Sequence, residues 1–103
     1  MSIVIFVTTK NTEEAQNISQ TLVKKKLIAC ANIISGVKSI FWWAGKVDRA
    51  NETLLVIKSQ KRLLNQIIAT VKKIHSYDCP EIIALPIIGG NKDYLKWVKD
   101  SVK

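Results

Sequence analysis

The sequence predicts an α+β fold in which two βαβ units share one antiparallel sheet. Strand-like and helix-like segments alternate in the order β-α-β-β-α-β-α. Right-handed crossovers in both halves place the first two helices on one face of the sheet, which is the ferredoxin-like split sandwich. The two middle strands are adjacent in the chain and predict a long hairpin. No linker-like or low-complexity stretch interrupts residues 1–103, so we expect a single domain with an extra C-terminal helix.

The first half begins with an apolar, β-branched run at residues 3–8, which predicts a buried central strand. Asn11 and Glu14 are spaced as a helix N-cap and its reciprocal partner. We therefore expect the first helix over about residues 12–26, ending in a run of lysines.

Residues 28–34 and 37–43 read as two parts of one strand, separated by Ser35-Gly36. Such an interruption predicts a bulge or bend within one long strand. Ala44-Gly45-Lys46 and the polar residues 48–52 are expected to form the turn region, and residues 53–58 the returning strand.

The second half repeats this order. Ser59 is expected to cap a helix that ends before Pro80, because the residue preceding a proline is disfavoured in the helical region. The apolar positions of this helix are spaced three and four residues apart. They are Leu64, Ile67, Ile68, Val71 and Ile74.

Residues 81–87 predict the last strand, and Pro86 predicts that it lies at an edge, since proline cannot donate to a ladder. A terminal helix over residues 93–102 follows. Its expected apolar side consists of Tyr94, Trp97 and Val98.

The net charge of +8 makes a polyanion the first partner to consider. Fourteen of the sixteen basic residues are lysine, and the short lysine runs fall at expected helix ends, where cations offset the helix dipole. An RNA-recognition module of this element order needs stacking aromatic residues on its third strand. Residues 53–58 contain no aromatic ring, so we expect no nucleic-acid partner.

The apolar runs are far shorter than the roughly 20 residues that a membrane span needs. The first residues also lack the pattern of a secretory leader. We therefore expect no membrane partner, a cytoplasmic location, and reduced thiols at Cys30 and Cys79.

Catalytic motifs are missing from the sequence. His75 is the only histidine, and no nucleophile motif accompanies it. Gly89-Gly90 lacks the Lys-Ser/Thr of a phosphate loop. We expect that the protein is not an enzyme.

Four segments of the chain stand out as motifs. They are Leu-Ile-Ala-Cys-Ala-Asn-Ile at 27–33, Gly-Val-Lys-Ser-Ile-Phe-Trp-Trp-Ala-Gly-Lys at 36–46, His-Ser-Tyr-Asp-Cys-Pro-Glu-Ile at 75–82, and Asp-Tyr-Leu-Lys-Trp at 93–97. In order and spacing they resemble the signatures of the CutA divalent-cation tolerance family. The resemblance implies a homotrimer of PII-like architecture, linked to divalent-cation tolerance and to copper binding.

The chain departs from the family pattern at several positions. Ser76 stands where proline is usual, Phe41 where tyrosine is common, and Ala44 where an acidic residue or glutamine is frequent. Some copper-linked members carry a cysteine near the end of the first strand, where this chain has Val7. A metal site that uses that cysteine is therefore not expected here.

Copper or another divalent cation is the expected cofactor, if one is bound. His75 and Cys79 supply soft ligands and Glu81 a carboxylate, and we predict that they contribute to a weak copper site between subunits. The alternatives are that His75 is a cation at a helix end and that both thiols only fill space.

A second constellation comprises Lys58, Tyr77 and Glu81, together with Cys30. Similarity to the family places these side chains at clefts between subunits. An interchain salt bridge is the alternative interpretation. The competing function is a PII-like regulator that binds a small anionic ligand in those clefts.

Phe41, Trp42 and Trp43 are expected at the trimer interface. Adjacent residues of a strand point to opposite faces, so one tryptophan is expected in the core and the other outside as an oligomer anchor.

Overall fold

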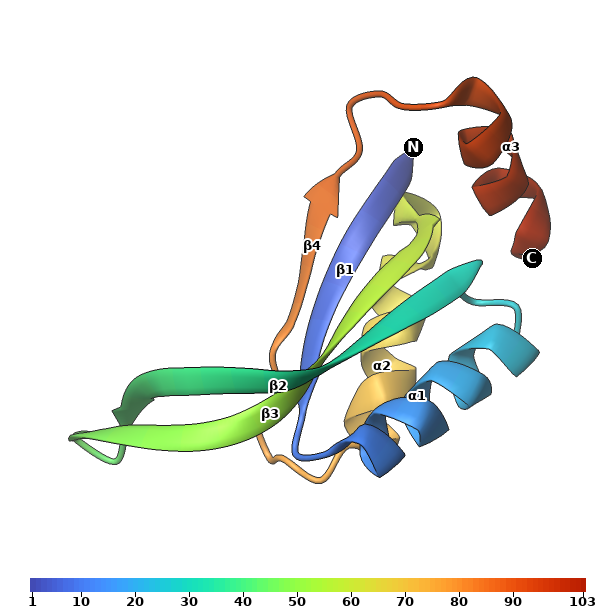
Figure 1. The fold of residues 1–103 in the computed structure, drawn as a ribbon. Coiled ribbons are helices and arrows are strands. Elements are labelled where there is room, and N and C mark those ends of the chain that lie inside the picture. Colours follow the sequence, from blue (N-terminus) through green and yellow to red (C-terminus); the bar gives the residue numbers. More distant parts are fainter.

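A computed structural model describes all residues from 1 to 103. Four antiparallel strands form one sheet in the order β2-β3-β1-β4, and α1 and α2 cover one of its faces (Figure 1). This arrangement confirms the ferredoxin-like prediction. The elements are β1 (Ser2–Thr9), α1 (Thr12–Lys24), β2 (Cys30–Trp43), β3 (Lys46–Gln60), the 3-10 helix η1 (Lys61–Leu63), α2 (Leu64–Ile74), β4 (Ile82–Pro86) and α3 (Lys92–Ser101).

The core lies between the sheet and the two covering helices. Every second residue of β1 is buried, and the same alternation holds in the second half of β3. Each fully buried aliphatic side chain contributes about 1.5–3 kcal/mol relative to exposure. The central members are Ile5, Val7, Ile18, Leu22, Leu55, Ile57, Ile67 and Val71.

The start of α1 confirms the predicted cap, because the Asn11 side chain accepts a hydrogen bond from the Glu14 backbone at 2.8 Å. The Glu14 carboxylate does not return to Asn11; it accepts from the Lys10 N–H at 3.1 Å. The helix ends at Lys24, two residues earlier than predicted, since Lys26 has a left-handed backbone with φ 56°.

The hairpin is longer and tighter than predicted. Its turn is Ala44-Gly45, both with positive φ, and β3 begins at Lys46. Residues 48–52 were expected in the turn but are strand, because they satisfy their backbone groups by pairing with residues 37–41 of β2. The predicted bulge is confirmed by a register shift between Ile34 and Val37.

Ser59 was predicted to cap the second helix, and that prediction is wrong. It is the penultimate residue of β3, and its hydroxyl donates to the Leu27 carbonyl at 2.6 Å. The chain enters α2 through η1 instead. The edge position of β4, which carries Pro86, is confirmed.

The second face of the sheet carries no helix across its centre (Figure 1). We call this surface the open face; its apolar side chains are half-buried or exposed and are Val4, Phe6, Leu54, Val56, Ile83 and Leu85. α3 lies at one end of the sheet, and only Val98 of that helix is fully buried. None of the helices has the length and apolar character that a membrane crossing requires.

Candidate functional site

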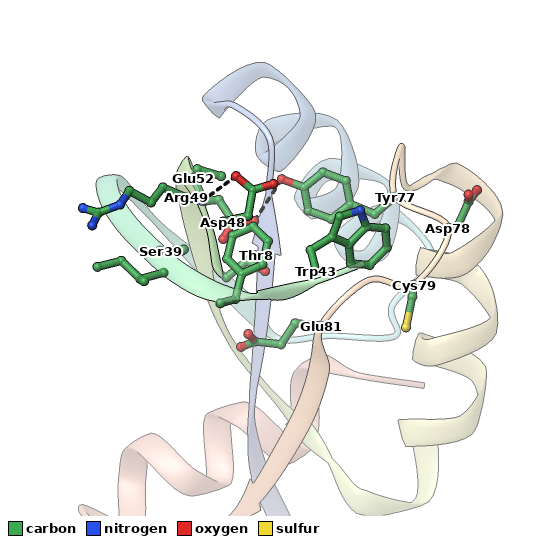
Figure 2. A pocket seen from close by; sticks show the side chains of 13 residues that line it. Thr8, Ser39, Trp43, Asp48, Arg49, Glu52, Tyr77, Asp78, Cys79 and Glu81 are labelled. Atoms are coloured by element: carbon green, nitrogen blue, oxygen red, sulfur yellow. Dashed lines mark hydrogen bonds between the residues drawn. The ribbon is translucent and has the colours of Figure 1, made fainter. Parts of the chain in front are cut away.

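A groove of about 720 Å³ lies at the root of the long hairpin (Figure 2). One wall comes from the paired strands β2 and β3, the floor from Thr8 at the end of β1, and the other wall from residues 77–81. Three aromatic rings line it, those of Phe41, Trp43 and Tyr77.

The groove is acidic in a basic protein. Four carboxylates line it against one guanidinium, that of Arg49. The chain has only eight acidic residues, so half of them are gathered here. An anion would meet net repulsion in this groove, whereas a cation would be attracted. The four carboxylates belong to Asp48, Glu52, Asp78 and Glu81.

The wall at residues 77–81 exists because α2 stops sharply. His75 leaves the helix with an extended backbone, at ψ 140°. The next residue, Ser76, donates its N–H to the Glu14 carboxylate of α1 at 2.8 Å. The Tyr77 hydroxyl donates to Glu52 of β3 at 2.9 Å, across the groove (Figure 2). The turn is thus fastened to α1 and to β3 by separate side-chain hydrogen bonds.

The His75 side chain is only 9% exposed and stabilises the turn through hydrogen bonds at both ring nitrogens. Its Nε2 lies 2.8 Å from the Thr8 carbonyl, which can only accept, so Nε2 carries the proton. Its Nδ1 accepts the Tyr77 N–H at 3.0 Å. Both ring nitrogens are occupied in a neutral imidazole. This geometry is not that of a cation at a helix end, and it leaves no lone pair for a metal.

Titration of the surrounding groups follows from these bonds. Partial burial acts to raise the pKa of Glu14, but the hydrogen bonds from Ser76 and Lys10 outweigh it and lower that pKa below its ordinary value of 4.5. Burial, followed by the hydrogen bond to Glu52, raises the pKa of Tyr77 to about 12. The phenol of Tyr77 therefore remains a hydrogen-bond donor at neutral pH.

The predicted metal ligands are only partly brought together. Cys79 and Glu81 both line the groove, whereas His75 lies behind its wall with its nitrogens engaged. No three side chains of His, Cys, Asp or Glu meet closely enough within the chain to hold a metal. A single chain therefore does not fit a complete copper site, and the intersubunit site stays a prediction.

The second group of predicted site residues does not lie in one place in the structure. Tyr77 and Glu81 line the groove, but Cys30 and Lys58 face each other across the β2–β3 ladder. The Lys58 ammonium donates to the side chain of Asn32 on β2.

Cys30 has a partner that the sequence did not suggest. Its Sγ lies 3.5 Å from the Tyr94 hydroxyl of α3. This hydrogen bond, followed by burial, raises the pKa of Tyr94 to about 12. The pair ties α3 to the start of β2, at the edge of the open face.

The residues predicted for the trimer interface are all exposed in one chain. Trp42 is 75% and Trp43 61% exposed, and Phe41 is also at the surface. The expectation that one tryptophan fills the core is wrong, because this part of the hairpin extends beyond the core and has none of its own (Figure 1).

Asp48, Arg49 and Glu52 were missed because residues 48–52 were assigned to a turn. The available signal was the length of the preceding strand. A strand over residues 37–43 needs a partner of similar length, and only the residues directly after Gly45 can supply it.

Comparison with known proteins gives one consistent result. The family model for CutA1 divalent ion tolerance protein matches residues 3–101. The chain is 46% identical over 102 residues to Protein CutA 1, chloroplastic, of Oryza sativa subsp. japonica, and this match covers 99% of the chain and 58% of the rice protein. It is 39% identical over 99 residues to the divalent-cation tolerance protein CutA of Archaeoglobus fulgidus, covering 96% of each.

Solved structures agree with the sequence relatives. The divalent cation tolerance protein (Cut A1) of Thermus thermophilus has a TM-score of 0.98 at 38% identity, with full coverage of both chains. CutA1 of Oryza sativa has a TM-score of 0.96 at 46% identity, covering 99% of this chain and 94% of that one. The chain thus spans little more than half of the full-length rice relative but nearly all of the archaeal one.

Proposed function

Because the chain belongs to the CutA1 divalent ion tolerance family, we propose that it serves in the cytoplasmic response to divalent metal ions as a homotrimer. The observation that carries this proposal is the amount of apolar surface that one chain leaves uncovered, on the open face and along the outer hairpin. That the proposed assembly has three chains follows from the family resemblance.

The outer hairpin consists of residues 37–52, which we call the arm. Four of its five large apolar side chains are consecutive in β2, and all five are exposed; they are Ile40, Phe41, Trp42, Trp43 and Val47. Soluble monomers rarely expose contiguous apolar patches of this kind, which mark association surfaces. Tryptophan is also enriched among residues that dominate binding energy.

Copies of one chain are the simplest occupants of these surfaces. A patch that meets a different patch on the next copy forms a ring when the rotation closes. The arm of one chain and the open face of the next are both apolar and lie in different places, as such a heterologous contact requires (Figure 1).

A growth assay tests the link between assembly and tolerance. Cells that lack their own family member are challenged with a copper salt and supplied with the wild type or with Trp42→Ser/Val47→Ser, a cross-strand pair on the arm. We expect the wild type to restore growth and the arm variant to fail while its circular dichroism stays that of a folded chain. Tolerance restored by a variant that sediments as single chains would contradict the proposal.

For the metal itself we propose weak copper binding in the acidic groove, through Cys79 and Glu81, completed by a neighbouring copy. The exposed thiol of Cys79 and the negative charge around it support this. His75 takes no part, since its nitrogens are engaged.

Calorimetric titration of copper into three proteins separates these roles. Cys79→Ser is expected to weaken binding, whereas His75→Gln is expected to leave the binding constant of the folded protein near that of the wild type. Indistinguishable isotherms for the wild type and Cys79→Ser would end the copper proposal without affecting the proposed trimer. We propose no catalytic step, and the four carboxylates of the groove outnumber its one guanidinium and oppose an anionic ligand.

A further inference from the structure

The positive charge of the chain is concentrated at the end of the molecule opposite the arm. Six of the eight acidic residues lie in the groove or in the first turn of α1, near the arm. Six basic residues lie in the same half and balance them: Lys10, Lys38, Lys46, Arg49, Lys72 and Lys73. The other ten basic residues and two acidic residues, which together give the net charge of +8, therefore belong to the other half.

Three chain segments meet there and form what we call the basic end. The Lys103 N–H donates to the Lys26 carbonyl at 2.9 Å, and the Arg62 guanidinium donates to the Lys103 carbonyl. No acidic residue occurs in these segments, and the single ion pair of the chain, Lys96–Asp100, lies outside them. The basic end consists of the exposed residues Lys24, Lys25, Lys26, Lys61, Arg62 and Lys103.

Local stability does not account for these cations. Lys61 and Arg62 lie in η1, directly before α2, where the positive end of the helix dipole disfavours a cation. Lys26 has φ 56°, a conformation that costs a residue with a side chain about 1–2 kcal/mol and that glycine adopts freely. Only Lys24 and Lys25, at the C-terminus of α1, have a favourable dipole.

We propose that the basic end is a docking surface for a bilayer that contains anionic phospholipids. Five of its six cations are lysines, which act on phosphate as point charges without demanding a fixed geometry. Each basic side chain near an anionic bilayer contributes about 1 kcal/mol, or about fivefold in partitioning. This interaction is peripheral and needs no membrane-spanning helix.

A bilayer fits this end better than a nucleic acid. The cations of the basic end are not interleaved with aromatic side chains, and the exposed rings of the neighbouring α3, Tyr94 and Trp97, pack on each other with centroids 5.5 Å apart. The loop between β4 and α3 lies at the same end, because the Ile87 N–H donates to the Ser2 carbonyl while Lys61 donates to the carbonyl of residue 1. In that loop Ile88 is 100% exposed. An exposed aliphatic side chain at the same end of the molecule as the lysines can enter the headgroup region, whereas it has no partner on a phosphate backbone.

Co-sedimentation with vesicles tests the proposal on the intact chain. We expect the wild type to bind phosphatidylcholine vesicles that contain about 30% phosphatidylserine at low ionic strength, to bind less at high salt, and not to bind pure phosphatidylcholine. Lys25→Gln/Lys26→Gln/Arg62→Gln/Lys103→Gln is expected to lose about fivefold per cation removed.

A charge-matched variant is the control. Lys10→Gln/Lys46→Gln/Lys72→Gln/Lys73→Gln removes the same charge from the arm half and is expected to bind within a few-fold of the wild type. Lys26→Gly is a second probe, which should melt at a higher temperature than the wild type because it relieves the left-handed backbone, yet bind the vesicles less.

Three results would overturn the proposal. They are no binding of the wild type to anionic vesicles at low salt, an equal loss in both quadruple variants, and binding of a DNA duplex at a salt concentration where the vesicles are not bound.

Discussion

The body of the molecule and the arm are built from the same two strands but are stabilised differently. In the body, β3 alternates buried and half-buried residues, and its buried ones pack against α1 and α2. In the arm, the same strand pairs with β2 residue by residue, yet no side chain is buried. An isolated two-stranded hairpin is marginal in water, which is why we propose that the arm is stabilised by surfaces outside its own chain. Backbone pairing sets its shape, and the proposed association is what would bury its side chains.

The largest expected difference between the body and the arm comes from replacing isoleucine by alanine once in each region. Ile57→Ala removes a fully buried side chain from the body and is expected to cost about 2–5 kcal/mol of unfolding free energy. Ile40→Ala removes the same atoms from the arm, where the side chain is 63% exposed. It is expected to weaken assembly and to leave the stability of the dissociated chain nearly unchanged.

Urea unfolding of the dissociated chain, with sedimentation of the assembled one, measures both quantities. An Ile40→Ala variant that loses as much intrinsic stability as Ile57→Ala would show that the arm packs on its own chain.

The junction of body and arm is expected to give the next largest effect. His75→Ala leaves the Thr8 carbonyl and the Tyr77 N–H without partners, at a cost of about 1–3 kcal/mol. Hydrogen exchange should report faster exchange at the Tyr77 amide. Lys73→Ala, an exposed change in the last turn of α2, is the control and should stay within about 0.5 kcal/mol of the wild type. Equal losses in both variants would contradict the role assigned to His75.

Acidification should loosen the same junction through Glu14. Its pKa is lowered in the folded chain, so its contribution to stability is present above the ordinary value of 4.5 and is lost as the pH falls through the folded pKa. We expect the wild type to lose more stability below pH 4.5 than Glu14→Gln does.

Glu13→Gln is the matched control, since Glu13 lies in the same turn and its side chain accepts no hydrogen bond. Identical acid profiles for Glu14→Gln and the wild type would remove Glu14 from the account.

The smallest effect is spectroscopic and involves both tyrosines. The pKa of each is raised to about 12 from an ordinary 10.0, Tyr77 by burial and Glu52, and Tyr94 by Cys30 and burial. Their stabilising contributions are therefore complete below pH 10.0 and are lost as the pH rises toward 12. Phenolate absorbance of the folded protein should appear near 12 and that of the urea-unfolded protein near 10.0, with Tyr94→Phe isolating Tyr77. A folded-state midpoint near 10.0 would contradict both hydrogen bonds.

Local sequence chemistry predicted most of the body. The Asn11 cap and the edge position of Pro86 follow from which backbone groups a residue can satisfy, and both are confirmed. The turn over residues 48–52 was wrong for the converse reason. Polar residues favour turns, but cross-strand pairing overrides that preference wherever a partner strand is available. The prediction that Ser59 caps a helix was wrong for the same reason, since this residue lies in the paired strand β3.

The candidate site was less predictable because its contacts join distant parts of the chain. Cys30 and Tyr94 are 64 residues apart, and Tyr77 and Glu52 are 25 apart. Residue type alone suggested His75 as a ligand, whereas its two hydrogen bonds, one of them to Thr8 at 67 residues' distance, make it a positioning residue.

The most direct test of the account is the mass of the wild-type protein in dilute solution, measured by sedimentation equilibrium at micromolar concentration. Two further copies that cover the arm and the open face predict a single species of three times 11.6 kDa. A stable species of one chain, soluble and folded at that concentration, would contradict it.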